Sequence, residues 1–364
     1  MAKVTIAGLA QRLGISKASV SYALNGRAGV GPDTRERVLA LAQELGWYPS
    51  SSARALSQAR SETIGIVLLR DPEHVGSEPF YMSVLAGIEA VLSSRELNLM
   101  LRIVAPDGGG APIVGGADVK PLAGPPAGRR DLAVYRRWAG ESRVDGVLLF
   151  DEVRSDPRGP LLGSLGLPYV QVGGSAASGA RGGSTTVDQS MDAATVTDAL
   201  HSLGHRHFAY VSGPPDLAHE DLRSASLAAH ARRLGMTLVT SASDYTAPDG
   251  EAATIAVMAG VAPGSEGFPT AIVYGNDLMA MGGLAALQRL GIPVPAQVSV
   301  VSWDDSIMCQ FSSPPVAAMA RNVTELGRQS ALLLLNIIDG HAATNRAMPA
   351  GVLQHRSSLG AARP

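Results

Sequence analysis

Apolar residues recur with helical spacing near the start of the chain and predict three short helices. The predicted helices are residues 5–13, 16–25 and 32–45. Gly14 ends the first helix, Ser16 is a good N-cap for the second, and Pro32 suits the first position of the third. A short link between the first two helices predicts a helix-turn-helix, whose second helix can enter a DNA major groove. An ordinary corner between two helices is the alternative interpretation.

Beyond residue 62, short apolar strands alternate with helical segments. The predicted strands are residues 64–69, 98–104, 146–150, 169–172, 207–211, 237–239, 271–274 and 298–302. The predicted helices are residues 82–93, 135–142, 191–203, 222–234, 251–259 and 278–290. Such alternation is typical of doubly wound parallel sheets. A second series, beginning at residue 184, predicts a second lobe, with a ligand cleft where the carboxyl ends of the strands meet.

The composition indicates the number of domains and the cellular compartment. The 364 residues are 46% hydrophobic and 17% charged, which suits two or three globular domains. A single cysteine, Cys309, indicates a reducing compartment. The N-terminus lacks the apolar core of a signal peptide, and the longest apolar run, residues 331–335, is too short to span a membrane, so we predict a cytoplasmic protein.

The net charge of −2 hides a basic N-terminus. Residues 1–60 contain eight Lys or Arg and three acidic residues, a net of +5, so the remaining chain carries −7. A polyanion such as DNA would be attracted to the N-terminal segment and repelled by the rest of the chain. Residues 106–128 are rich in Gly, Pro and Ala without periodicity, and we predict a disordered insertion there.

The N-terminal residues resemble the headpiece of the LacI/GalR (lactose-repressor) family of bacterial transcription regulators. The matching residues are Val4, Thr5, Ile6, Gly14, Ser16, Val20, Ser21, Leu24, Asn25, Thr34, Arg35, Glu36, Arg37, Val38, Leu45, Gly46, Tyr48, Pro49, Ala53, Arg54, Ala55 and Leu56. Gly8 departs from the pattern, because the family usually has an acidic residue there.

The remaining chain resembles the two-lobed sensor domain of the same family, which is similar in fold to periplasmic sugar-binding proteins. The motifs are Leu203, Gly204, His205, Asn276, Asp277, Val294, Pro295, residues 298–301, Trp303, Asp304, Asp305, Pro314, Pro315, Leu326 and Gly327. Ser302 departs from the usual Gly before Trp303, and the Gly-rich segment 173–183 is unusual.

The resemblance implies an all-α headpiece at residues 1–49, a hinge helix or linker at 50–60 and an effector-binding α/β domain at 61–364. Within that domain we expect an N-lobe of about 61–174 and 303–322, and a C-lobe of about 184–302 and 323–356. The expected crossings between the lobes lie near residues 174–184, 302 and 322.

The resemblance also implies which residues contact DNA. Lys17, Ala18 and Tyr22 occupy the specificity positions of the second helix, from which a side chain can reach base edges. The residues expected to bind phosphates are Thr5, Ser16, Ser19, Ser21, Asn25 and Thr34. Ala53 and Leu56 belong to the hinge, where a leucine enters a minor-groove step in this family. The alternatives are packing for Tyr22, a solvated Lys17 and a plain tether in place of the hinge helix.

The candidate effector-binding residues come from the same resemblance. They are Phe80, Asp151, Arg223, Tyr245, Asn276 and Asp304. Carboxylates, an amide and a guanidinium can bind vicinal hydroxyls, while flat aromatic rings suit a pyranose, so we expect a mono- or oligosaccharide. The alternatives are a turn or helix cap for Asn276 and Asp304, a solvated Arg223 and ordinary core packing for Tyr245.

Together these features predict a homodimeric DNA-binding regulator. We expect a repressor of carbohydrate-utilisation genes, associated with the nucleoid when bound to DNA and released from its operator by a sugar. A regulator that needs a corepressor, a transport protein that binds sugars, and a sugar hydrolase that uses Asp304 or Asp305 are the alternatives. The sequence contains no catalytic motif that we recognise, and His201, His205 and His207 lack the spacing of a metal site, so we expect neither an enzyme nor a cofactor.

Overall fold

A computed structural model describes residues 5–47, 60–105, 129–177, 179–259, 264–265 and 267–362. The chain forms two compact units, Met1–Ser61 and Glu62–Pro364. Most of the expected hinge, including Ala53 and Leu56, and the expected insertion at 106–128 lie outside the described residues. No helix among the described residues is long and apolar enough to cross a membrane.

The small unit contains the three predicted helices, α1 (Ile6–Leu13), α2 (Lys17–Leu24) and α3 (Pro32–Glu44). Gly14 ends α1 in the left-handed region at φ 65°, a conformation that glycine adopts without strain. Leu9, Val20 and Val38, one from each helix, are fully buried against one another. The helix-turn-helix prediction is therefore confirmed, with boundaries within one residue.

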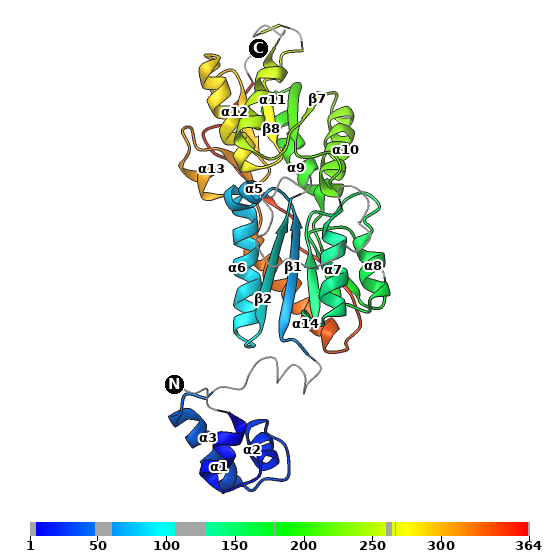
Figure 1. Ribbon diagram of the computed structural model, residues 1–364. Helices are drawn as coiled ribbons and strands as arrows, with labels where there is room; N and C mark the ends of the chain where they lie inside the picture. Colours follow the sequence, from blue (N-terminus) through cyan, green and yellow to red (C-terminus); the bar gives the residue numbers. More distant parts are fainter. Residues whose placement is uncertain are drawn as a thin grey trace, which may run out of the picture. The chain divides into compact units, whose positions relative to one another are not determined.

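The first lobe of the large unit, the N-lobe, contains a parallel six-stranded sheet in the order β11-β5-β4-β3-β1-β2. Its strands are β1 (Thr63–Leu69), β2 (Asn98–Val104), β3 (Gly146–Leu149), β4 (Tyr169–Val172), β5 (Gly182–Thr186) and β11 (Asn345–Ala347). Its helices are α5 (Pro72–Ser77), α6 (Pro79–Ser93), α7 (Asp131–Gly140), α8 (Arg158–Ser164) and α14 (Val323–Ile338). The helices α6 and α14 cover one face of the sheet, and α7 and α8 cover the other (Figure 1).

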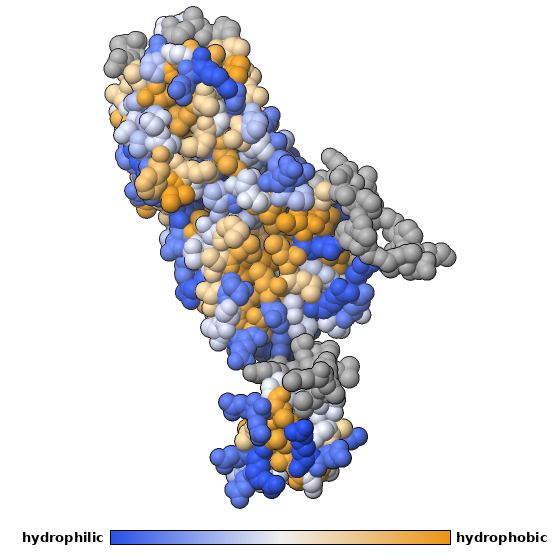
Figure 2. Space-filling view, turned by 60° about the vertical axis from the view of Figure 1, so that its left-hand side comes forward, coloured by the Kyte–Doolittle hydropathy of each residue, from blue (hydrophilic) through white to orange (hydrophobic). Residues whose placement is uncertain are grey.

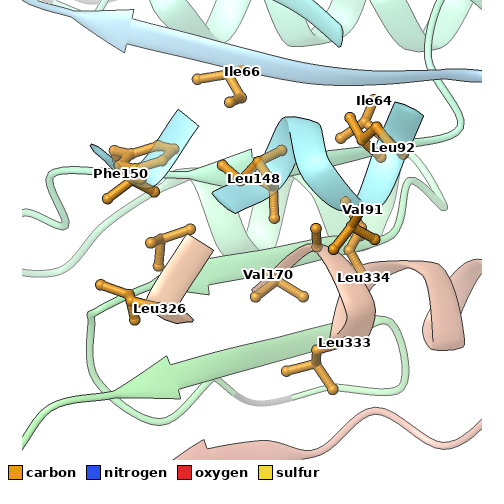
Figure 3. Close-up of a cluster of buried hydrophobic side chains, with 14 of the residues drawn as sticks. Ile64, Ile66, Val91, Leu92, Leu148, Phe150, Val170, Leu326, Leu333 and Leu334 are labelled. Carbon is orange, nitrogen blue, oxygen red and sulfur yellow. The ribbon is translucent and has the colours of Figure 1, made fainter. Parts of the chain in front are cut away.

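The core between the sheet and the helices α6 and α14 is closely packed. Ile64 and Ile66 from β1 point toward Leu148 from β3, and Val91 and Leu334 pack beside them (Figure 3). These are strands buried on both faces, which explains why they read as continuous apolar runs in the sequence.

The second lobe, the C-lobe, contains a six-stranded sheet in the order β12-β10-β9-β8-β6-β7, parallel except for β12. Its strands are β6 (His207–Ser212), β7 (Thr237–Ala242), β8 (Ala271–Tyr274), β9 (Ser299–Ser302), β10 (Ala317–Ala320) and β12 (Val352–Gln354). Its helices are α9 (Gln189–Ser202), α10 (Ala218–Arg233), α11 (Ala247–Met258), α12 (Asp277–Arg289) and α13 (Ile307–Phe311). The fold class predicted from the sequence is confirmed.

The expected division between the lobes was wrong in three places. The segment 303–322 was assigned to the N-lobe, but β10 pairs with β9 and β12 in the second sheet. The segment 323–356 was assigned to the C-lobe, but α14 packs in the core of the first sheet, and β11 pairs with β5. Strand β5 itself, expected to begin the second series, pairs with β4.

The chain therefore passes between the sheets at residues 187–188, 321–322 and 348–351 within the part that the structure describes. Of the three expected crossings, the one near residue 322 is confirmed, and those near 174–184 and 302 are not. Alternation of strands and helices identifies the elements but does not indicate which sheet each strand joins.

Candidate functional site: helix-turn-helix surface and interlobe cavity

The second helix of the headpiece presents the expected specificity residues to solvent. Lys17 and Ala18 are exposed in its first turn, and Tyr22, one turn further along, is 41% exposed. Val20 and Ala23 on the opposite face are buried in the headpiece core. The helix can therefore offer one face to a partner while the other holds it in place.

Several expected phosphate-binding residues lie at helix ends. Thr5 and Ser16 are N-caps, and the Oγ of Ser16 accepts a hydrogen bond from the backbone N–H of Ser19 at 3.0 Å. The Nδ2 of Asn25 donates to the carbonyl of Ser21 at 2.8 Å and closes the other end of α2. These side chains fix the ends of α2. Thr34 is partly buried in the first turn of α3.

A cavity of about 370 Å³ lies in the large unit and is lined by residues from both lobes. Many lining residues directly follow strands, among them Arg70 after β1, Gly275 after β8 and Arg321 after β10. The predicted position of the cleft, at the carboxyl ends of the strands, is therefore confirmed. The candidate residues that line the cavity are Phe80, Asp151, Arg223, Tyr245 and Asp304.

Asn276 does not line the cavity, so its selection as a cavity residue was wrong. It is 1% exposed and serves as the N-cap of α12, accepting a hydrogen bond from the N–H of Met279 at 2.9 Å. Its Nδ2 donates to the carbonyl of Tyr245 at 3.0 Å, where the backbone has φ 73°. The helix-cap alternative describes Asn276 correctly, and the residue supports the cavity by holding Tyr245.

On the N-lobe side, an ion pair joins the residues that follow β1 and β3. The Nε of Arg70 donates to the Oδ2 of Asp151 at 3.0 Å, and the hydroxyl of Tyr81 donates to the same oxygen at 2.6 Å. Burial alone would raise the pKa of Asp151, but the charge and hydrogen bonds of Arg70 and Tyr81 lower it to about 2. Arg70 also lies over the ring of Tyr245, 5.3 Å from its centroid, so the two lobes touch across the cavity.

On the C-lobe side, Arg223 is held by a buried carboxylate. Its Nη1 donates to Glu220, 1% exposed, at 2.7 Å, and its Nε donates to Gln189 at 2.9 Å. The hydroxyls of Tyr210 and Tyr245 both donate to Glu220 at 2.5 Å. Burial favours a raised pKa for Glu220, but the attraction of Arg223 and these hydrogen bonds lower it. The carboxylate therefore fixes Arg223 and Tyr245 at the cavity wall.

His219 extends this network as an uncharged side chain. Its Nε2 lies 2.7 Å from the hydroxyl of Tyr245, whose proton is donated to Glu220, so His219 is the donor of that pair. Burial and the charge of Arg223 lower the pKa of His219 to about 4.

Two cations lie over the ring of Trp303, with the Cζ of Arg223 5.0 Å and the Cζ of Arg321 5.6 Å from its centroid. Arg321 pairs with the fully buried Asp192 at 2.7 Å and lies 3.8 Å from Asp304, whose pKa is raised mainly by burial. The alternative of a solvated Arg223 is wrong, because the residue is buried and paired with Glu220. As for the two alternatives for Asp304, the residue lies in a bend after β9 but caps no helix, since Ser306 is the N-cap of α13.

Residue-by-residue matching missed several lining residues, namely Arg70, Glu78, Gln189, His219 and Arg321. A search for polar side chains directly after predicted strands would have found Arg70, which follows a recognised strand. Arg321 follows β10, a strand that the sequence analysis did not identify. Gln189 and His219 lie in first turns of helices and carried no comparable signal.

No group of three potential metal ligands occurs among the residues that the structure describes. His205, one of the three clustered histidines, is buried and lies 2.8 Å from the hydroxyl of Thr270 and 3.0 Å from the carbonyl of Gly360. Both ring nitrogens of His205 therefore have partners within the fold, as expected of a packed structural residue.

Comparison with known proteins agrees with this geometry. Residues 5–50 match the family described as bacterial regulatory proteins, lacI family, and residues 197–359 match the periplasmic binding protein-like domain. The HTH-type transcriptional regulator CelR of Thermobifida fusca is 30% identical over 342 residues, covering 92% of this chain and 92% of that protein.

Two solved structures are similar over most of the chain. A LacI family regulator from Bifidobacterium animalis subsp. lactis has 29% identity and a TM-score of 0.69, covering 84% of this chain and 100% of that one. The transcriptional regulator CelR in complex with cellobiose has 26% identity and a TM-score of 0.67, covering 98% of this chain and 100% of that one.

A helix-turn-helix headpiece joined to a two-lobed domain with a cavity between its lobes defines a DNA-binding transcription regulator, not an enzyme. The chain belongs to the LacI family of bacterial regulatory proteins.

Proposed function

We propose that this regulator is a cytoplasmic, homodimeric repressor of carbohydrate-utilisation genes, which a mono- or oligosaccharide releases from a pseudo-palindromic operator. The observation that supports the sugar is the composition of the cavity. Phe80 and Tyr245 offer aromatic faces, and Asp151, Arg223 and Asp304 offer charged groups that bind hydroxyls. The related regulator CelR has been solved with cellobiose, which makes a disaccharide a reasonable first choice.

We propose direct reading of DNA by α2. Lys17 can donate to guanine O6 or N7, Ala18 can contact a thymine methyl, and Tyr22 can donate a hydrogen bond or pack. The remaining candidates, Thr5, Ser16, Ser19, Ser21, Asn25 and Thr34, would hold phosphates. Ala53 and Leu56 stay predictions for the minor groove.

The dimer is proposed from exposed apolar side chains on both lobes. Met82 on α6 is 63% exposed and Leu101 on β2 is 40% exposed, while Ile307 and Phe311 on α13 are 68% and 81% exposed. Figure 2, which brings the side of α6 forward, shows apolar surface gathered on this face. Contiguous apolar surface of this kind marks a protein interface, and a dimer lets two recognition helices read two half-sites.

Sugar and DNA would be coupled through the arrangement of the two lobes. A sugar that contacts both lobes favours one arrangement, and a shift of the N-lobes at the dimer interface would change the spacing of the headpieces. The coupling is reciprocal, so operator DNA must weaken sugar binding by the same factor.

Isothermal titration calorimetry of the full-length protein with cellobiose, maltose, trehalose, glucose and ribose tests the effector class. We expect saturable binding of at least one sugar, with loss of binding in Asp304→Ala. Failure of every sugar to bind would contradict the proposal.

The Lys17→Ala substitution tests the role of α2. We expect a loss of about 1–3 kcal/mol in affinity for the specific site, because one base contact disappears, and little change in affinity for random duplex. Fluorescence anisotropy with both duplexes measures the two affinities. Thr34→Ala is the matched comparison, since loss of a phosphate contact should weaken both complexes alike. Equal weakening of both complexes by Lys17→Ala would assign Lys17 to the backbone instead.

A further inference from the structure

One buried acidic side chain at the cavity has no partner. Glu78 occupies the N-cap position of α6, but its side chain does not cap the helix. The residue is 9% exposed and lines the cavity, and its carboxyl makes no hydrogen bond or ion pair within the described residues. Buried polar groups in proteins are normally satisfied, so an unpartnered carboxyl aimed into a ligand cavity indicates a group that meets its partner on the ligand.

The charges around Glu78 do not neutralise it. Arg70, the nearest cation, is engaged by Asp151, and the other carboxylates that face Glu78 are Asp304 after β9 and Asp277 on α12. Elsewhere around the cavity, the other two arginines are also engaged. Arg223 pairs with Glu220, and Arg321 pairs with Asp192. An ionised Glu78 would therefore add negative charge beside other carboxylates, with only the already paired Arg70 to attract it.

Burial and the neighbouring carboxylates favour the protonated form of Glu78. Burial, which outweighs the attraction of Arg70, raises the pKa of Glu78 to about 8, and Asp151, Asp304 and Asp277 add to the rise. A carboxylic acid that keeps its proton at neutral pH has an O–H group that can donate a hydrogen bond.

We propose that Glu78 is a specificity residue of the effector cavity, which donates a hydrogen bond from its uncharged carboxylic acid to a ring or glycosidic oxygen of the bound sugar, an oxygen that has no proton to donate in return. The inference rests on the proposed sugar effector and adds a consequence to it. Since only the protonated carboxyl donates, sugar affinity is full below the pKa of Glu78 and falls as the pH rises through it.

The test is calorimetry with the same five sugars at pH 7 and pH 9, using the full-length protein. For a single proton and a pKa of about 8, the protonated fraction and with it the affinity fall roughly tenfold between the two pH values. Glu78→Gln keeps an N–H donor at the same place, so we expect it to bind at pH 7 within about threefold of the unchanged protein and to lose the pH dependence. Glu73→Gln, an exposed glutamate on α5, is the matched control and should behave like the unchanged protein.

The outcomes separate this inference from the proposed function. Binding of a sugar with equal affinity at both pH values, or a pH dependence that persists in Glu78→Gln, would overturn the role of Glu78 and leave the sugar effector intact. Failure of all five sugars at both pH values would overturn the sugar effector and, with it, the inference.

A second measurement does not need a sugar. In a carbon-13 NMR titration of protein labelled at the glutamate carboxyl carbons, one resonance should titrate near pH 8 and be absent in Glu78→Gln. If the resonance that disappears in Glu78→Gln titrates near the ordinary glutamate pKa of 4.5, the inference is wrong.

Discussion

Arg223→Ala is expected to abolish sugar binding and to lower the free energy of unfolding by about 3–5 kcal/mol, because it leaves a buried charge without its partner. The charge is the carboxylate of Glu220, 1% exposed, which accepts hydrogen bonds from Arg223, Tyr210 and Tyr245. Chemical denaturation measures the stability, and calorimetry measures the binding.

The loss of stability should depend on pH. Arg223 helps to hold the pKa of Glu220 below its usual 4.5, so the pair stabilises the fold above that pH and loses its contribution as the pH falls through the lowered pKa. The difference in stability between Arg223→Ala and the unchanged protein should therefore shrink toward acid pH.

Two further variants make this prediction specific. Arg223→Lys keeps the charge but cannot reproduce the fork of hydrogen bonds to Glu220 and Gln189, so we expect weak or absent sugar binding with a smaller loss of stability. Arg232→Ala, an exposed arginine on the same helix, is the matched control and should change neither quantity. Sugar binding that survives Arg223→Ala would remove this arginine from the proposed site.

Gly87→Ala is expected to destabilise the N-lobe by about 1–3 kcal/mol or more, because α6 and α14 cross with their backbones in contact. A Cβ on Gly87 would overlap the carbonyl oxygen of Thr324, and a Cβ on Gly327 would overlap the carbonyl oxygen of Val84. Neither backbone can move aside as a flexible side chain would. Thermal unfolding followed by circular dichroism measures the effect.

The control for this prediction is Gly140→Ala, at the end of α7, where an added Cβ meets nothing within 4 Å. There the helix propensity of alanine should leave stability unchanged or raise it by about 0.5–1 kcal/mol. Similar effects of the two substitutions would show that the close crossing of α6 and α14 does not limit the choice of residue at position 87.

The sequence predicted where individual helices and strands lie better than it predicted which strands pair and which lobe each element joins. Helices α1, α2 and α3 follow from apolar spacing together with Ser16, Gly14 and Pro32, which are local signals that tertiary contacts did not override. Strand β8 is a four-residue apolar run with turn signals on either side. Sheet membership is different, because it depends on hydrogen bonds between segments far apart in the chain, and β5, β10 and α14 were assigned to the wrong lobe.

For single residues at the cavity, the sequence likewise predicted some positions correctly and missed others. Five of the six candidates line it. Asp151, Tyr245 and Asp304 follow β3, β7 and β9, where residues emerge at the cleft of a parallel sheet, whereas Phe80 and Arg223 reach it from α6 and α10. Asn276 also follows a strand, but it comes one position after the lining Gly275, and its side chain caps α12. The special character of Glu78 depends on which charges surround it in three dimensions, and spacing along the chain does not contain that information.

We propose that a sugar in the interlobe cavity controls the binding of the headpiece to DNA. The most direct test of this coupling is a fluorescence anisotropy titration of the full-length protein on duplexes from the upstream region of its own gene and on random duplex, at physiological salt, with and without the sugar that binds most tightly in calorimetry. We expect tighter binding to one upstream site than to random duplex. We also expect the sugar to weaken that complex and the DNA to weaken sugar binding by the same factor. Equal affinity for all duplexes, or specific binding that the sugar leaves unchanged, would contradict the proposal.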